Sequence, residues 1–285
     1  MIAITLEGRL GNQLFQYAFI YAASRRLNTT FFLDKSIENF MLPKYFEVKN
    51  DFLAPLDKSV FSIKGFKNIF RIHAKRRFYR FLNQVIFNGN RTVFDNYTPV
   101  KEILGQLKNG INYKGYFQSA QYFENYEKQI RSLFAIKKKF TSEFVALSSR
   151  VFSGKKNVVI HIRRGDYISH NFTLPGSYYK KAIKMVGGED FVYVFISDDP
   201  AYIENEFSYI SNKYISTGNE ITDLQFLINA DICILSSSSF SWWGAWLNNK
   251  ENKKVIAPNY WLGFDKLTEH PVGVILPEWT LIVAK

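Results

Sequence analysis

Short apolar runs alternate with longer amphipathic stretches along this chain, a pattern typical of strands alternating with helices. Residues 2–6 form the first apolar run and predict a strand. A stripe at helical spacing follows it, made of Leu14, Phe15, Ala18, Phe19, Ala22 and Ala23. A second strand is predicted at 30–34, whereas 35–115 has no single period and 119–150 has a mostly helical pattern.

The second half of the chain has a clearer rhythm. Residues 157–162 (Asn-Val-Val-Ile-His-Ile) form an apolar, β-branched run that predicts a strand buried on both faces. The elements expected after it are strands at 191–196, 232–235 and 254–257, and helices near 177–185, 201–207, 222–229 and 239–248. The helix at 222–229 is expected from the capping-box spacing of Thr222 and Gln225. This alternation predicts a parallel sheet with helices on both faces.

The length of 285 residues suits one large or two modest α/β domains. Basic and small residues at 137–139 and 153–156 interrupt the pattern between the two halves. We therefore predict an α/β protein with an N-terminal domain over 1–153 and a C-terminal, Rossmann-like domain over 154–285.

The formal net charge of +12 indicates an anionic partner, such as a phosphorylated substrate, an acidic membrane surface or nucleic acid. Nine Lys or Arg and no acidic residue occur between Lys58 and Arg91. Apolar residues recur there at helical spacing: Phe66, Ile69, Phe70, Phe78, Phe81, Leu82, Val85 and Ile86. Such a helix either lies on an anionic membrane or packs on its own domain with a solvated basic face.

The few cysteines and histidines in the sequence argue against a disulfide bond and against a metal site built from these residues. The single cysteine, Cys233, lies in an apolar run and reads as a small core residue. Four histidines and the absence of any Asp-x-Asp sequence make a dedicated metal site unexpected. The N-terminus reads as a strand and not as a signal peptide, and no run reaches the length of a membrane span. A cytoplasmic location is therefore expected.

The segment His161–Tyr167 follows the predicted strand at 157–162 and carries the most suggestive chemistry. Side chains at the carboxyl end of such a strand face the crevice where open α/β sheets bind ligands. Arg163 and Arg164 suit bidentate binding of phosphate or carboxylate oxygens. The alternative is a surface ion pair between an arginine and Asp166.

Three further strand ends carry polar groups. Ser236–Ser239 leads directly into a predicted helix, so its hydroxyl and N–H groups either bind an anion or only cap the helix. Asp198 and Asp199 either accept hydrogen bonds from a nucleoside or cap the helix at Pro200. The loop 8–13 after the first strand is glycine-rich but is neither a dinucleotide-binding motif nor a P-loop.

Together these segments resemble the bacterial α-1,2-fucosyltransferases of glycosyltransferase family 11. The resemblance is carried by Gly8–Ala18 (GRLGNQLFQYA), His161–Tyr167 (HIRRGDY), Ser197–Asp199 (SDD) and Ser239–Gly244 (SFSWWG), in the family's order. It implies a GT-B-like arrangement of two Rossmann-like domains, the N-terminal one on the acceptor side and the C-terminal one binding GDP-fucose. It also implies that fucose is transferred with inversion and without a metal ion or other cofactor, to a galactose-containing glycan, most simply at its 2-OH.

The resemblance also implies roles for individual residues. Arg163 would clamp the β-phosphate, and His161 would help to hold the nucleotide. The remaining donor-binding residues expected are Arg164, Asp198, Asp199, Ser238, Ser239, Phe240 and Ser241, and those near the reacting sugar are Arg9, Gly11, Asn12 and Gln13.

For catalysis we expect Arg163 to stabilise the leaving diphosphate. Asp166 is the candidate general base and Asn12 an orienting group, although Asp166 could equally serve only to hold an arginine in place. Glu7 is the second candidate base.

Two other interpretations remain open at this stage. One is a nucleotide-sugar transferase of the same fold with a different donor. The other is a module that binds an anionic membrane or nucleic acid through the basic stretch 58–91, although this would leave the strand-end motifs without a purpose. With fucosyl transfer, only peripheral membrane contact is expected in addition, and no nucleic acid. The acceptor glycan is not predicted from the sequence.

Overall fold

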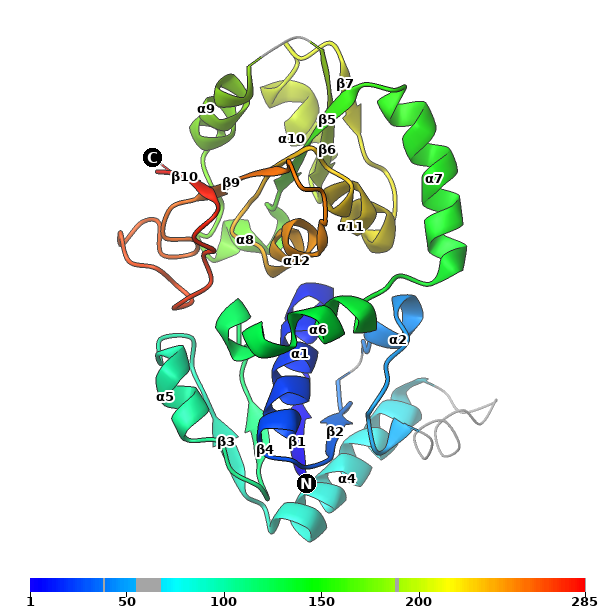
Figure 1. The fold of residues 1–285 in the computed structure, drawn as a ribbon, viewed down its shortest axis with the longest axis vertical. Coiled ribbons are helices and arrows are strands. Elements are labelled where there is room, and N and C mark those ends of the chain that lie inside the picture. Colours follow the sequence, from blue (N-terminus) through cyan, green and yellow to red (C-terminus); the bar gives the residue numbers. More distant parts are fainter. Residues whose placement is uncertain (38, 55–67, 188–189, 285) are drawn as a thin grey trace. The chain divides into compact units, whose positions relative to one another are not determined.

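The computed structural model describes residues 1–37, 39–54, 68–187 and 190–284, and side chains are described for these residues except 68–71. The chain divides into two compact units, Met1–Ala135 and Ile136–Lys285. Each unit is built on a parallel sheet with helices (Figure 1). The expected α/β class is confirmed.

The first unit contains a four-stranded parallel sheet with the strand order β2-β1-β4-β3. Its strands are β1 (Ile2–Thr5), β2 (Phe31–Asp34), β3 (Arg91–Val93) and β4 (Asn112–Lys114). Its helices are α1 (Leu10–Arg26), α2 (Leu42–Tyr45), α4 (Asn68–Phe87), α5 (Val100–Gly105), α6 (Glu127–Leu133) and the 3₁₀ turns η1 (Ala120–Tyr122) and η2 (Glu124–Tyr126). The strands expected at 2–6 and 30–34 are confirmed. The strands β3 and β4 lie in the segment that the sequence pattern left undivided.

Helix α1 is buried on almost all sides, and not only along the apolar stripe that the sequence predicts. Its two glutamines explain how a helix with polar positions can be buried. Gln16 Nε2 donates to the Gly115 carbonyl (2.9 Å), and Gln16 Oε1 accepts from the Glu7 N–H (3.0 Å). A buried amide that has hydrogen-bond partners avoids the desolvation cost of an unpaired one. Gln16 thereby joins the loops that follow β1 and β4.

The second unit contains a six-stranded parallel sheet with the order β10-β9-β8-β5-β6-β7. Its strands are β5 (Lys156–Ile162), β6 (Phe191–Ser197), β7 (Lys213–Ile215), β8 (Ile232–Ile234), β9 (Lys254–Pro258) and β10 (Thr280–Ile282). Its helices are α7 (Lys138–Phe152), α8 (Gly165–Ser169), α9 (Gly176–Val186), α10 (Pro200–Glu206), α11 (Glu220–Ile228) and α12 (Ser239–Leu247). The parallel sheet predicted for this half is confirmed. The pattern did not reveal β7, β10 or α8.

Helix α7 belongs to the second unit because it packs on α11. The Phe144 and Phe152 rings of α7 lie 5.0 Å and 5.8 Å from the Phe226 ring of α11. The division between the units therefore falls before α7, after Ala135, whereas the boundary expected from the sequence, between 153 and 154, falls after it.

Helix α11 begins earlier than its sequence predicts. The Asn219 side chain accepts hydrogen bonds from the N–H groups of Ile221 (3.2 Å) and Thr222 (3.1 Å), so Asn219 is the N-cap. The capping box predicted at Thr222 and Gln225 is wrong, because an asparagine three residues earlier caps the first turn instead.

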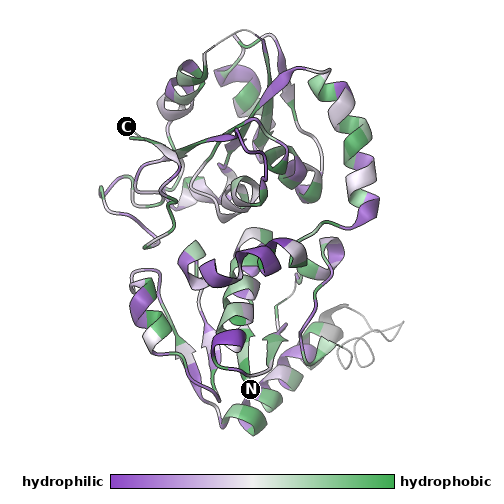
Figure 2. Cartoon of the chain, in the orientation of Figure 1, coloured by the Kyte–Doolittle hydropathy of each residue, from purple (hydrophilic) through white to green (hydrophobic). Residues whose placement is uncertain are grey.

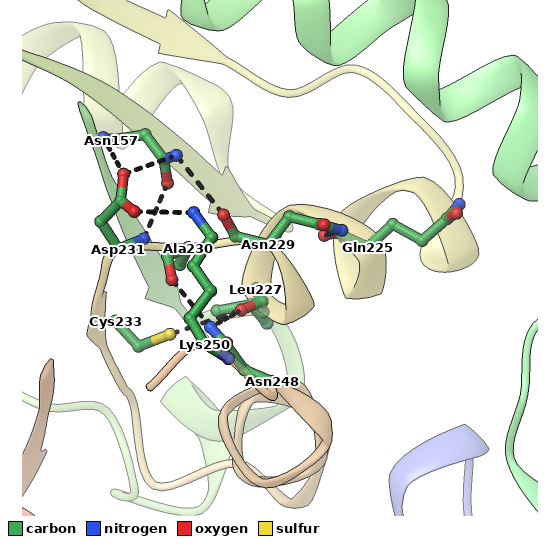
Figure 3. Close-up of polar contacts among 9 residues, drawn as sticks. All are labelled: Asn157, Gln225, Leu227, Asn229, Ala230, Asp231, Cys233, Asn248 and Lys250. Atoms are coloured by element: carbon green, nitrogen blue, oxygen red, sulfur yellow. Dashed lines mark hydrogen bonds and ion pairs between the residues drawn. The ribbon is translucent and has the colours of Figure 1, made fainter. Parts of the chain in front are cut away.

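A polar clamp holds the amino ends of β5 and β8 together (Figure 3). The Asp231 carboxylate accepts from the Asn157 N–H (2.9 Å), and its other oxygen lies 2.7 Å from Lys250 Nζ. Asn248 Nδ2 donates to the carbonyls of Leu227 and Ala230. These contacts fix the end of the sheet opposite to the strand ends that carry the candidate chemistry.

Helix α4 covers one face of the first sheet and carries most of the basic stretch, of which 58–67 lie outside the described residues. Tyr79 and Phe87 are buried against β1 and β2. Phe81 and Val85, which the sequence placed on one apolar stripe, are 63% and 64% exposed. Hydrophobic and hydrophilic positions alternate along this helix (Figure 2). Within the described ranges, no helix has both the length and the apolar character needed to span a bilayer.

Candidate active site

The carboxyl ends of β8, β5 and β6 lie side by side, because these strands are neighbours and run parallel. Hydrogen bonds join the segments that follow them. The Tyr167 hydroxyl donates to the Ser237 carbonyl (3.1 Å), and the Arg164 N–H donates to Asp198 Oδ1 (2.9 Å). Ligands bind at this edge in open α/β sheets. The structure thus brings together the three strand-end segments of the second unit that the sequence singled out.

Arg163 directly follows β5, and its side chain is 17% exposed. Nη1 lies 2.9 Å from Asp198 Oδ2, and Nη2 lies 2.5 Å from Asp166 Oδ1. The Arg–Asp ion pair considered from the sequence is therefore present. A guanidinium has more N–H donors than these two contacts use. The carboxylates hold the guanidinium in one orientation and leave part of its donor set for an anion.

Arg164 points toward the carboxyl end of β6. Its Nε lies 2.9 Å from Asp199 Oδ2, and its guanidinium carbon lies 3.8 Å from the centre of the Tyr202 ring. This combination of ion pair and cation–π contact fixes the side chain against α10. Arg164 therefore serves to join the ends of β5 and β6.

Asp198 and Asp199 have different tasks in the structure. Asp199 Oδ1 accepts from the Tyr202 N–H (3.1 Å), which makes it the N-cap of α10. Its contacts with Arg164 and this N–H lower the pKa of its carboxyl group. Asp198 receives Arg163 and the Arg164 N–H, and a Cβ at Gly165 would lie only 2.6 Å from its Oδ2. Both aspartates thus hold the arginines, and the cap considered from the sequence is confirmed for Asp199.

His161 is buried at the end of β5 beside the serine loop. Its Nδ1 lies 2.7 Å from Ser236 Oγ, and its ring centre lies 5.5 Å from that of Phe240. Burial, helped by the charge of Arg163, lowers the pKa of His161 to about 3. His161 is therefore neutral near pH 7 and contributes a hydrogen-bonding ring, not a positive charge.

The serine run caps α12 and is largely occupied by internal contacts. Ser238 is the N-cap, with Oγ accepting from the Phe240 N–H (3.3 Å). Ser237 Oγ donates to the Trp261 carbonyl, and Ser241 Oγ donates to the carbonyls of Ser236 and Ser238. The hydroxyls expected to contact an anion at 238 and 241 are thus engaged within the protein. Ser239 and Phe240, which are partly exposed, begin the helix where backbone N–H groups attract anions.

The side chains of Gln13 and Asn12, both on α1, lie beside the glycine loop of the first unit. Gln13 is fully buried, and its amide binds the carbonyls of Gly8 and Asn39 and the Met41 N–H. Its N–H groups are all used, so it supports the loop instead of contacting a sugar. Asn12 is partly exposed, and its Oδ1 accepts from Gln118 Nε2 (2.8 Å).

Arg9, Gly11 and Glu7, which were also expected near the reacting sugar or as a base, differ in their exposure and contacts. Arg9 is exposed at the N-cap of α1, and Gly11 is buried inside the helix. Glu7, the second candidate base, forms an ion pair with Lys114 (2.8 Å).

One titratable residue of the second unit escaped the sequence analysis. Asp223 on α11 accepts a hydrogen bond from Ser216 Oγ (2.5 Å), which follows β7. Burial raises the pKa of Asp223 to about 7. The sequence gave no reason to select Asp223, because it lies between Thr222 and Gln225 in what looked like a capping box. Its partner Ser216 precedes α11, and only the structure shows that the two side chains meet. Perturbed carboxylates at such an edge are candidates for function.

Among residues 1–37, 39–54, 68–187 and 190–284, no cluster of three or more His, Cys, Asp or Glu side chains is arranged to hold a metal ion. The thiol of Cys233 is buried, and burial raises its pKa to about 12. Arg163 and the start of α12 lie near the strand ends and suit a diphosphate.

Open parallel α/β sheets bind nucleotides at this edge, and an arginine beside a helix start suits their phosphate groups. The sequence profile of Glycosyl transferase family 11 matches residues 1–283. The chain therefore belongs to this family and is a glycosyltransferase.

Two relatives from Escherichia coli extend over most of the chain. The O-antigen biosynthesis glycosyltransferase WbnK is 34% identical, over 90% of this chain and 93% of its own. An alpha-1,2-colitosyltransferase is 28% identical, over 94% of each chain.

Solved fucosyltransferases share the fold. The alpha-1,6-fucosyltransferase NodZ of Bradyrhizobium, co-crystallised with GDP, has a TM-score of 0.54 at 13% identity and matches 86% of this chain and 91% of its own. A mutant of Arabidopsis thaliana FUT1 in complex with GDP has a TM-score of 0.53 at 11% identity, over 90% of this chain and 69% of its own. The GT-B-like fold implied by the family resemblance is confirmed.

Proposed function

We propose that the protein transfers L-fucose from GDP-fucose to the 2-OH of a galactoside within a glycan, with inversion and without a metal ion. The observation that carries this proposal is the position of Arg163, which the ion pairs to Asp166 and Asp198 fix at the carboxyl end of β5. The neighbouring loop supplies the start of α12. The family membership and the GDP bound to the similar fucosyltransferase folds support this donor.

In the proposed mechanism, negative charge develops on the departing GDP as its bond to fucose breaks. The free N–H groups of Arg163 and the N–H groups that begin α12 would stabilise that charge. His161 stays neutral and would donate or accept a single hydrogen bond. At the same edge of the sheet, Asp223 accepts a hydrogen bond from Ser216 Oγ, and we assign it to the nucleoside side of the donor, together with Asp198.

The acceptor hydroxyl must lose a proton as it attacks the anomeric carbon. We assign this proton to Asp166, whose side chain is 49% exposed, with Glu7 as the second candidate. Asn12 would orient the reacting sugar. Because Asp166 also pairs with Arg163, its contribution to catalysis has to be separated from its effect on that arginine.

The test is a donor panel of GDP-fucose, GDP-mannose, UDP-galactose and UDP-glucose with a β-galactoside acceptor, with and without EDTA. We expect release of GDP from GDP-fucose alone, unchanged by the chelator. We also expect a product in which nuclear magnetic resonance locates an α-linked fucose on the 2-OH. Release of nucleotide from a UDP-sugar only, or complete loss with EDTA, would contradict the proposal.

A colitosyl donor is the second candidate, because one relative is named as an alpha-1,2-colitosyltransferase. The donor panel separates the two when nucleotide-activated colitose is added to it. A larger kcat/KM for that donor than for GDP-fucose would favour the second candidate.

Peripheral contact with an anionic membrane is a separate part of the proposal. It is supported by the exposed Phe81 and Val85 on α4, beside the exposed Arg77. Sedimentation with phosphatidylglycerol vesicles should recover the protein, and Phe81→Ser with Val85→Ser should reduce the recovery. Equal recovery with phosphatidylcholine vesicles would argue against it.

A further inference from the structure

The first unit contains a polar groove between α4 and the face of its sheet. Its volume is about 430 Å³, within the usual size range of small-molecule sites. The groove is lined by residues from the end of β2, from α4 and from the starts of β3 and β4. Arg76, Arg80 and Arg91 line it, and among the lining residues that the structure describes Asp34 is the one that is acidic.

The floor of the groove is a hydrogen-bonded chain of polar residues, in which Asp34, Asn112 and Thr5 are buried and Asn83 is partly exposed. Asn83 Nδ2 donates to Asp34 Oδ2 (3.0 Å), and Asn112 Nδ2 donates to Asn83 Oδ1 (2.7 Å). Thr5 Oγ1 lies 3.2 Å from Asn112 Oδ1. The face of a sheet that a helix covers is ordinarily apolar. Packing of α4 on the sheet therefore does not require these hydrogen-bonded polar side chains. They give the groove a fixed hydrogen-bonding surface.

Arg80 and Arg91 provide positive charge at the edge of the groove. Asp34 is 2% exposed, and its oxygens already bind Asn83 and the Ser36 N–H. The Arg91 side chain is 43% exposed, and its Nη2 lies 4.0 Å from Asp34 but donates to Thr5 Oγ1 (3.3 Å). Arg80 is exposed, and among the residues that the structure describes no carboxylate lies within ion-pairing distance of it. Among the described contacts, Asp34 is therefore the one carboxylate near Arg91, and Arg80 adds a second guanidinium to the groove.

We propose that this groove binds the oxyanion of a carbohydrate ligand, a phosphate or a carboxylate, through Arg80 and Arg91. The amides of Gln84 and Asn90 would bind its hydroxyl groups. Guanidinium groups bind such oxyanions with charge-assisted hydrogen bonds, and amides suit sugar hydroxyls. That this ligand is part of the glycan acceptor rests on the proposed function, whereas the binding itself does not.

The test measures binding by calorimetry on the full chain saturated with GDP, so that the diphosphate-binding residues of the second unit are occupied. The probes are galactose 1-phosphate, galacturonate, inorganic phosphate and galactose. We expect galactose 1-phosphate or galacturonate to bind at least tenfold more tightly than galactose and than inorganic phosphate. The stronger of the two identifies the oxyanion as phosphate or carboxylate.

The matched variants are Arg80→Gln in the groove and Arg77→Gln, which is exposed on the same helix and does not line it. Arg80→Gln should weaken binding about tenfold, the usual effect of losing one charge-assisted hydrogen bond, and Arg77→Gln should not. Arg91→Lys, which keeps the charge, should weaken it less than Arg91→Gln. Thermal unfolding checks that each variant is folded.

Two results would overturn the proposal: equal affinity of Arg80→Gln and Arg77→Gln for the probe, or binding of inorganic phosphate as tight as that of the sugar derivatives. A failure of GDP to stabilise the protein would instead count against the proposed function. In that case the same titrations without GDP still compare the two variants.

Discussion

Arg163 and Asp198 form an ion pair of 2.9 Å that connects the end of β5 to the end of β6. The two residues are far apart in sequence but become neighbours because β5 and β6 pair along their whole length. Asp166 holds the same guanidinium from α8. The arginine is thus placed before any ligand arrives, which lowers the entropic cost of using it.

Replacing Arg163 tests whether this geometry serves catalysis. We expect Arg163→Lys to lower kcat/KM for GDP-fucose by about 10²–10³, because lysine keeps the charge but loses the forked donor set. Arg150→Lys on the exposed side of α7 is the control, and it should retain full activity. Steady-state GDP release measures both. Turnover of Arg163→Lys near the level of the control would remove Arg163 from the mechanism.

Replacing Asp166 separates proton transfer from the positioning of Arg163. Asp166→Asn removes a negative charge beside the guanidinium, so GDP should bind as tightly as before or more tightly. If Asp166 is the base, kcat falls by about 10²–10⁴ and the acidic limb of the pH–rate profile disappears. Calorimetry with GDP and pH profiles of kcat provide the two measurements. A loss of kcat matched by weaker GDP binding would assign Asp166 to positioning only.

The strands that position these residues were predictable because they are long and apolar. Strands β5 and β6 have seven residues each, so their runs stand out from the flanking polar segments. Strands β3, β4, β7 and β10 have three residues each, too few for a period to show. The three-residue strand β8 was still predictable because it lies in the apolar run 232–235. The ends of β5, β6 and β8 indicated the candidate site, but not which of its charges pair.

Which charges meet depends on contacts distant in sequence. The sequence predicted that Asp198 and Asp199 contact a nucleoside but did not predict that they also form ion pairs with Arg163 and Arg164. The serines expected to meet an anion are partly consumed by the carbonyls of their own loop and of Trp261. Neighbouring residue types predict what chemistry is present at a strand end, and only the structure decides which groups remain for a ligand.

Asp223 should make the stability of the protein depend on pH. Its pKa is about 7 in the folded chain, compared with an ordinary value of 3.8, so the folded state binds this proton more tightly than the unfolded state does. This contribution stabilises the protein below about pH 4 and is lost as the pH rises through about 7. Asp223→Asn, which carries no charge, should therefore gain stability relative to the parent protein over that interval.

Urea unfolding from pH 4 to pH 8 measures this difference, with Glu251→Gln at an exposed position as the control. The control should run parallel to the parent protein at every pH. A gap between Asp223→Asn and the parent protein that stays constant with pH would mean that Asp223 does not retain its proton on folding.

Substitution of Gly8 tests the role of the Asn12 side chain without replacing Asn12. Gly8 has φ +72°, and a Cβ there would lie 2.4 Å from Asn12 Nδ2. Gly110 has φ +74° with no atom within 4 Å of such a Cβ. Alanine at either position costs about 1–2 kcal/mol for the left-handed backbone, but only at Gly8 must Asn12 also move.

We therefore expect both Gly8→Ala and Gly110→Ala to lose stability in thermal unfolding, Gly8→Ala the more because Asn12 must move, while kcat falls only in Gly8→Ala. Asn12→Ala should lower kcat to a comparable extent, because in both variants the amide no longer orients the reacting sugar. If Gly8→Ala keeps the kcat of Gly110→Ala, displacement of the Asn12 amide has no effect on the reaction, and the role assigned to this residue is wrong.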